Sequence, residues 1–151
     1  MPFDEGPYIQ AACFCDQVIE AKDGSLSLIR IIDTLWHQEA GPNPPMDMPA
    51  FPFQIKLVLM LKSGRAEGRF EVNIVPELPN GETERAITNT VHFEGEEKGQ
   101  NMVVQFAYVF RLEGLYWFKV LVGDVKITAI PLRIRYRRIV IPVPPMPPST
   151  P

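Results

Sequence analysis

"MVVQFAYVFRL", residues 102–112, has the most regular alternation of large apolar side chains in this chain. Every second position is apolar: Met102, Val104, Phe106, Tyr108, Phe110 and Leu112. Successive side chains of a β-strand point to opposite faces, so these six would share one face. The pattern therefore predicts a strand with one side packed against a hydrophobic core.

Seven further segments have the composition of strands, and turn residues separate them. They are residues 9–20, 25–36, 53–62, 69–78, 86–95, 116–124 and 125–138. Asp23-Gly24 and Asn80-Gly81 are clear turn signals, because glycine and asparagine accept positive φ. About eight short strands predict an all-β fold, a single antiparallel β-sandwich that is Greek-key and immunoglobulin-like, with a closed β-barrel as the alternative.

The segment "LEGLYWF", residues 112–118, gives a local reason to favour the sandwich. It spaces Leu112, Gly114 and Tyr116 as in the tyrosine corner of Greek-key sandwiches. In that corner the tyrosine hydroxyl bonds to the backbone a few residues upstream. We expect Tyr116 to have this structural role.

The chain of 151 residues is long enough for one domain with a core of its own. We expect residues 1–138 to form the β-sandwich domain. Residues 139–151, "IVIPVPPMPPSTP", are expected to form a Pro-rich C-terminal tail. Proline favours extended polyproline II and cannot donate a hydrogen bond to a sheet, so the sheet should end before the tail.

The composition excludes several functional classes. A formal net charge of -3 argues against general nucleic-acid binding, which requires an excess of Lys and Arg. The N-terminus "MPFDEGPYIQ" lacks the basic start and apolar run of a secretory signal. The longest apolar runs are too short to span a membrane. We therefore expect a cytoplasmic protein with no membrane or nucleic-acid partner.

The two cysteines, Cys13 and Cys15, are one residue apart on a predicted strand. Their side chains would run parallel on one face, about 6.6 Å apart by the strand rise. A disulfide requires Cβ atoms about 3.8 Å apart, so a bond between them is excluded on a regular strand. The spacing also lacks the pattern of zinc and redox motifs. We expect both to pack as small buried apolar residues.

The sequence offers little for catalysis. His92 follows the polar face of its strand, and His37 begins a Pro-rich connection over residues 37–51 that has no periodicity. Asp33, His37 and Glu39 could form a polar cluster, but ordinary surface charges are the simpler interpretation. No acid, base and oxyanion stabiliser come together. We expect no catalytic residues, no metal and no cofactor, and hence not an enzyme.

The Pro-rich loop, residues 41–52, is the first candidate site for a partner. Its candidate contact residues are Pro44, Pro45, Met46 and Met48. A connection of this length in a small domain is either a crossover between sheets or a binding loop, and both alternatives stay open.

The segment "RIRYRR", residues 133–138, is the second candidate. It alternates Arg133, Arg135 and Arg137 on one side with Ile134 and Tyr136 on the other. A basic strand face can contact phosphate, an acidic partner or a neighbouring subunit. It can equally be an edge strand that charge protects from aggregation.

The tail is the third candidate, with Pro144, Pro145 and Pro147 at its centre. It is either disordered or docked onto a partner or a sister subunit.

Two stretches, "CDQVIEAKDGSLSLIRIIDTLW" and "GLYWFKVLVGD…IPLRI", resemble an uncharacterised bacterial family, domain-of-unknown-function family 6941. The shared pattern begins at Cys15-Asp16, passes the Asp23-Gly24 turn and reaches Trp36 before a Pro-rich stretch. It continues with Gly114, Tyr116 and Phe118, a Gly123 turn and Pro131-Leu132. It covers most of residues 9–138. The resemblance implies an all-β bacterial domain with no established activity and no catalytic residues.

Three functions follow as hypotheses. The first is a non-enzymatic module that binds a partner protein or self-assembles into a homo-oligomer. The second is a small-molecule carrier with an apolar pocket between sheets, lined by Phe106, Tyr108, Phe110 and Trp117. The third, an enzyme that uses His37 or His92, is the weakest.

Overall fold

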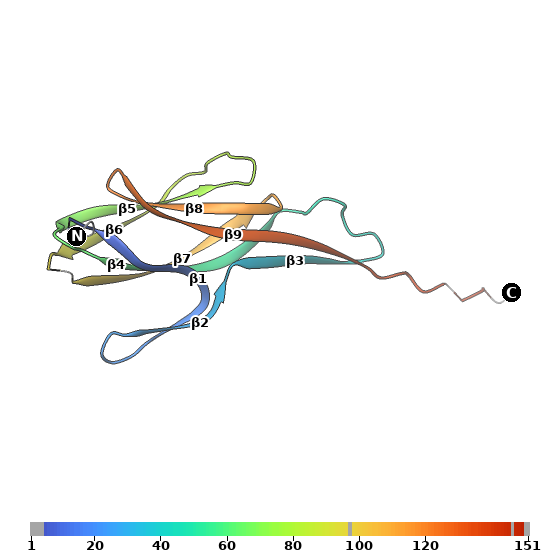
Figure 1. Cartoon of the computed structure of the whole chain (residues 1–151). Helices are drawn as coiled ribbons and strands as arrows, with labels where there is room; N and C mark the ends of the chain where they lie inside the picture. The colour runs from blue at the N-terminus through green and yellow to red at the C-terminus, as the bar shows by residue number, and fades with distance from the viewer. Residues whose placement is uncertain (1–4, 97, 146, 150–151) are drawn as a thin grey trace.

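The fold consists of nine β-strands in two sheets, in a computed structural model that describes residues 5–96, 98–145 and 147–149 (Figure 1). The strands are β1 (Tyr8–Glu20), β2 (Leu26–Ile32), β3 (Thr34–Gly41), β4 (Phe51–Lys62), β5 (Glu67–Glu77), β6 (Ile87–Glu94), β7 (Gly99–Phe110), β8 (Gly114–Val122) and β9 (Val125–Val140). No helix occurs in these described ranges. The prediction of an all-β chain is confirmed, with nine strands where about eight were expected.

The two sheets differ in the direction of their strands. The first has the order β2-β1-β4-β7 and is antiparallel throughout. The second has the order β3-β9-β8-β5-β6, and its β3–β9 pair is parallel. The prediction of a wholly antiparallel fold is therefore wrong for this pair. Each sheet ends in two edge strands, so the described strands do not close into a single barrel.

One hydrophobic core lies between the sheets and includes the stretch 102–112. Val104, Tyr108 and Phe110 are buried in this core, and Met102, Phe106 and Leu112 pack against it. Phe14 of β1 meets Phe118 of β8 edge to face, with ring centroids 5.0 Å apart, so residues of both sheets interlock. The one-sided packing predicted from the alternation is confirmed.

Residues 25–36, predicted as a single strand, form two strands in different sheets. β2 ends at Ile32 in the first sheet and β3 begins at Thr34 in the second. Ile32 and Leu35 are both buried in the core but lie three positions apart. A strand of period two cannot place both on one face, so the chain must break between them, at Asp33.

The segment 37–41, predicted to be irregular, is the end of β3. The full length of β3 pairs with β9, from Thr34 opposite Arg133 to Gly41 opposite Val140. Only residues 42–50 lie outside the strands, and they carry the chain from the second sheet to the first. Of the two alternatives for this loop, the crossover is therefore present.

The tyrosine corner is confirmed. The Tyr116 hydroxyl donates to the Leu112 carbonyl at 2.9 Å and accepts from the Leu112 N–H at 3.0 Å. The side chain of Tyr116 is completely buried. The corner thus satisfies two backbone groups where the chain passes from β7 in one sheet to β8 in the other.

Tyr108 is a nearby contrast to Tyr116. Its hydroxyl is buried and has no hydrogen-bond partner among the residues that the structure describes. Burial raises the pKa of Tyr108, and the neighbouring Glu84 carboxylate raises it further, although that carboxylate does not meet hydrogen-bond geometry. The two tyrosines share one core, with ring centroids 6.1 Å apart.

We expect Tyr116→Phe to lower the free energy of unfolding by about 1–3 kcal/mol, because it leaves the Leu112 N–H and carbonyl unsatisfied. Urea denaturation measures this change. Tyr108→Phe is the matched control. It removes a hydroxyl that has no partner, so its free energy of unfolding should stay the same or rise by about 1 kcal/mol. Equal losses in the two variants would contradict the assigned role of Tyr116.

Candidate functional site

The parallel pair formed by β3 and the end of β9 extends beyond the rest of its sheet. We call residues 34–41 and 133–140 the terminal ribbon. The ladder between β8 and β9 ends at Gly114 opposite Ile134, whereas the ladder between β3 and β9 continues to Val140. β9 also continues to Val140, past the boundary predicted between a domain ending at residue 138 and a tail beginning at residue 139. Beyond Ile134 the ribbon therefore consists of β3 and β9 alone, with an inner and an outer face.

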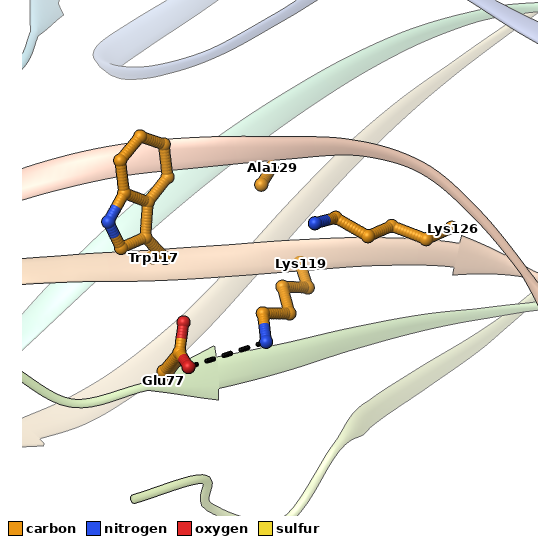
Figure 2. Close-up of a pocket in the computed structure, with 5 residues that line it drawn as sticks. All are labelled: Glu77, Trp117, Lys119, Lys126 and Ala129. Atoms are coloured by element: carbon orange, nitrogen blue, oxygen red, sulfur yellow. Dashed lines mark ion pairs between the residues drawn. The ribbon is translucent and has the colours of Figure 1, made fainter. Parts of the chain in front are cut away.

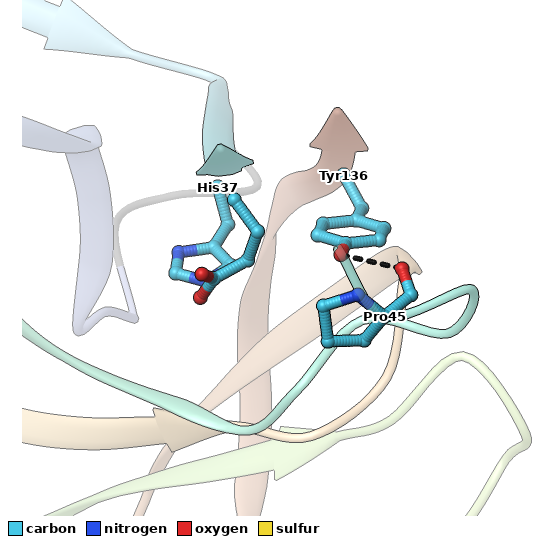
Figure 3. Close-up of polar contacts among 4 residues, drawn as sticks. His37, Pro45 and Tyr136 are labelled. Atoms are coloured by element: carbon cyan, nitrogen blue, oxygen red, sulfur yellow. Dashed lines mark hydrogen bonds and ion pairs between the residues drawn. The ribbon is translucent and has the colours of Figure 1, made fainter. Parts of the chain in front are cut away.

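The inner face of the terminal ribbon holds the Pro-rich loop. The Tyr136 hydroxyl donates to the Pro45 carbonyl at 2.7 Å, as Figure 3 shows. Arg138 donates to the Pro44 carbonyl from Nε at 3.1 Å and from Nη2 at 2.9 Å. Hydrogen bonds from a charged donor are stronger than neutral ones, so Arg138 is the main anchor of the loop.

His37 belongs to the same inner face. Its ring stacks on Phe51, with centroids 4.2 Å apart and planes 6° apart, and lies 6.1 Å from the Tyr136 ring. Its Nε2 is 2.9 Å from a Glu39 carboxylate oxygen, so two residues of the predicted polar cluster do meet. The third, Asp33, uses its backbone carbonyl to accept from Arg133 N–H. His37 thus packs from the inner face of the ribbon against Phe51 of β4.

The outer face of the terminal ribbon carries the basic residues. Arg133, Arg135 and Arg137 are exposed, as the alternation predicted. The Arg135 and Arg137 guanidinium carbons lie 5.6 Å and 4.7 Å from the centre of the Trp36 ring. Trp36 is 50% exposed, an unusual position for so large an apolar side chain. The outer face is therefore both cationic and aromatic.

β9 is not an edge strand, because it lies between β3 and β8. Of the three arginines, only Arg133 has a paired strand on both sides, so the interpretation as edge protection is wrong for Arg133. Arg135 and Arg137 lie where β8 no longer pairs with β9, and for them edge protection stays a prediction. Only its last residues, beyond Ile134, have β3 as their single ladder partner.

The residues predicted for the Pro-rich loop separate into two groups. Pro44 is buried and Met48 packs against the core, so both are structural. Pro45 is exposed, although its carbonyl binds Tyr136. Met46 is 76% exposed and is the loop residue most available to a partner.

The tail leaves the body of the molecule after its last backbone contact, in which Ile141 N–H donates to the Gly41 carbonyl at 2.8 Å (Figure 1). Pro144, Pro145 and Pro147 are exposed and lie outside the strands. Four large apolar residues just before and within the tail are also exposed: Ile139, Val140, Ile141 and Val143. An apolar segment thus continues directly from the terminal ribbon.

The candidate residues predicted from the sequence did not include Trp36, Tyr136 or Arg138. The alternation in residues 133–138 does place Tyr136 and Arg138 on one face of the strand, opposite Arg133, Arg135 and Arg137. However, their partners Pro44 and Pro45 are more than 90 positions away, with sequence separations of 94 and 91. Trp36 meets the arginines only through the parallel register of β3 and β9.

Cys13 and Cys15 are free thiols on the outer face of the first sheet. Phe14 lies between them in the chain and points into the core, so its two neighbours point away from it. Cys15 is nevertheless buried and Cys13 is partly buried. The predicted burial is therefore confirmed for Cys15 and only in part for Cys13. The expected packing in the core is wrong, because both side chains lie on the side of β1 opposite the core cluster.

A shallow pocket of about 360 Å³ lies on the outer face of the second sheet, lined by Glu77, Trp117, Lys119, Lys126 and Ala129 (Figure 2). Glu77 and Lys119 form an ion pair at 3.4 Å. Trp117 was expected between the sheets, but its chain neighbours Tyr116 and Phe118 occupy the core and Trp117 points outward. Phe106, Tyr108 and Phe110 pack against the rings of the core itself.

The described residues contain neither a metal-binding cluster nor a membrane-spanning helix. No cluster of three or more His, Cys, Asp or Glu side chains with the geometry to hold a metal ion occurs there. His92 is exposed, on the polar face that the sequence predicted. Within the same residues, no helix has the length and apolar character required to cross a membrane.

We expect Arg138→Ala to lower the free energy of unfolding by about 1–3 kcal/mol, because both of its hydrogen bonds to Pro44 are lost. The loop at residues 42–50 should also become sensitive to protease. Arg137→Ala is the matched control on the opposite face, and it should change the free energy by less than about 1 kcal/mol. Urea denaturation and limited proteolysis measure both effects. Similar losses in the two variants would contradict the anchoring role of Arg138.

We expect both thiols to react slowly with a thiol reagent at mildly alkaline pH. Burial raises the pKa of Cys13 and of Cys15, and the neighbouring Cys13 adds to the rise at Cys15. A raised pKa leaves less thiolate at a given pH, so the native chain should react more slowly than the unfolded chain. The difference should shrink as the pH rises, with Cys13 labelled first. Equal labelling of native and unfolded chains would contradict this packing.

Comparison with known proteins identifies a family but no activity. No curated protein matches the chain. Among solved structures the chain is similar to Pseudomonas fluorescens alkylpurine DNA glycosylase AlkC bound to DNA containing an abasic site analog, at 9% identity and a TM-score of 0.42. That similarity covers 82% of this chain and 30% of the glycosylase chain, and it carries no functional argument. The model of a family of unknown function, DUF6941, matches residues 10–135. This match confirms the resemblance seen in the sequence, and the chain belongs to the DUF6941 family.

Proposed function

We propose that the protein is a non-enzymatic module that binds another protein chain, a partner or a second copy of itself. The contact surface comprises the outer face of the terminal ribbon and the exposed apolar segment at its end, residues 139–143. The observation that carries this proposal is the apolar segment itself. Ile139 and Val140 are exposed at the end of β9, and Ile141 and Val143 are exposed in the chain directly after it.

Exposed apolar residues scattered singly are normal, but a contiguous exposed group indicates an interaction surface. Here the group continues from the terminal ribbon, whose exposed Trp36 and arginines are residue types enriched at protein interfaces. Proline in the tail lowers the entropy lost when an extended segment is held by a partner. These features together support protein binding.

The absence of catalysis is part of the same proposal. Of the two histidines, His92 is exposed and His37 is stacked between Phe51 and Tyr136. The thiols have a raised pKa, which disfavours the nucleophilic thiolate. Each of the four groups best suited to chemistry is thus occupied by packing, exposed to solvent or poorly ionised.

We also propose that the two sheets form one Greek-key β-sandwich. The shared core and the tyrosine corner support this arrangement. In this arrangement the interaction surface would lie at one end of a rigid body made of two packed sheets.

The test is a triple variant in which Val140, Ile141 and Val143 become threonine. These side chains are exposed, so the fold should remain intact. If a second copy is the partner, the full chain should be oligomeric by light scattering and the triple variant should be monomeric. If the partner is another protein, a complex cross-linked in host extract should be lost in the triple variant.

Val125→Thr is the matched control. Val125 is equally exposed but is the first residue of β9, at the opposite end of that strand. It should leave both the solution mass and any cross-linked complex unchanged. Solution mass and cross-linked complexes that are the same in the wild type and the triple variant would contradict the proposal.

A further inference from the structure

The three outward arginines of β9 form a regular ladder. Arg133, Arg135 and Arg137 lie at alternate positions of one strand, so neighbouring arginines are about 6.6–6.8 Å apart at the backbone. Their positions are set by the pairing of β9 with β3 along the terminal ribbon. The ladder is therefore part of a sheet and not of a flexible loop.

None of the three arginines has an acidic partner within the described residues. The ion pairs found there join Arg30 to Asp16, His37 to Glu39, Lys98 to Glu94 and Lys119 to Glu77. The residues of β3 opposite the ladder are Thr34, Trp36 and Gln38, none of which is acidic. The carboxylates of Glu39 and Glu113 bond to His37 and to the Tyr136 N–H instead. Three positive charges are thus left for an external anion.

Trp36 pre-arranges two of these charges. The guanidinium carbons of Arg135 and Arg137 lie over its ring, 5.6 Å and 4.7 Å from the ring centre. The cation–π contacts hold long side chains that would otherwise lose rotamer freedom on binding. Guanidinium groups also match carboxylates with two parallel hydrogen bonds, which lysine cannot do.

We propose that this arginine ladder binds an extended acidic segment of the partner chain, with carboxylates at every second residue. An extended polypeptide repeats its side chains with the same rise as β9, so acidic residues at positions i, i+2 and i+4 match the three arginines. The inference deepens the proposed function by giving the partner segment its chemistry. A polypeptide is favoured over a nucleic acid because the whole chain has a formal net charge of -3.

The test uses two synthetic peptides of the same composition, each with three glutamates among threonines. In one the glutamates alternate with threonine, and in the other they are adjacent. We expect the alternating peptide to bind more tightly, by fluorescence anisotropy at low ionic strength, and added salt to weaken its binding. Equal binding of the two peptides, or binding that is insensitive to salt, would overturn the proposal.

The double variant Arg135→Gln/Arg137→Gln should bind the alternating peptide roughly tenfold more weakly, because two charged contacts are lost. Lys22→Ala is the control, since Lys22 is an exposed cation in the turn between β1 and β2. It should bind as the wild type does. Urea denaturation shows whether each variant is folded. The salt dependence of peptide binding to the wild type tests the proposal independently of any variant.

A single-stranded oligonucleotide of matched charge is the third probe. Tighter binding of this oligonucleotide than of the alternating peptide would overturn the acidic-segment proposal in favour of a nucleic acid. The proposed function is judged separately, by the apolar triple variant. If that variant loses its partner while the arginine double variant keeps both the partner and the peptide, protein binding stands and the ladder has no part in it.

Discussion

Parallel pairing of β3 with β9 is the constraint on which the rest of the structure depends. Two backbone hydrogen bonds mark its ends: Arg133 N–H donates to the Asp33 carbonyl at 2.9 Å, and Ile141 N–H donates to the Gly41 carbonyl at 2.8 Å. To reach β9, the chain must leave the first sheet at Asp33, directly after β2. The crossover at residues 42–50 must then return it to the first sheet. The pairing thus decides both the break in the chain and the path of the Pro-rich loop.

The same pairing separates structural from functional side chains. On the inner face Tyr136 and Arg138 hold the loop, and His37 stacks on Phe51. On the outer face the arginines and Trp36 remain available, because the loop occupies only the other side. Alternation along one strand therefore places anchoring and binding residues at neighbouring positions. Substitutions at adjacent positions should consequently affect different properties, stability on one face and association on the other.

The sequence predicted the features that depend on local pattern. The alternation over residues 102–112, the tyrosine corner at Tyr116 and the outward arginines were all recognisable from period and spacing. The parallel pair was not, because its register joins residues about a hundred positions apart and leaves no local signal. The break at Asp33 had a signal in the odd spacing of Ile32 and Leu35, but the apolar residues rich in Ile and Leu on both sides of it looked like one strand. Trp36 became part of the candidate site only through the parallel pair.

The most direct test of this account is amide hydrogen exchange by NMR along β9. Parallel pairing in the observed register makes the N–H groups of odd-numbered residues donate to β3, whereas those of Arg138 and Val140 face away from it. The account predicts slow exchange at Arg135, Arg137 and Ile139 and fast exchange at Arg138 and Val140. Uniformly fast exchange from residue 135 to residue 140 would show that the terminal ribbon does not form. Protection with the opposite alternation would show that β9 pairs in a different register.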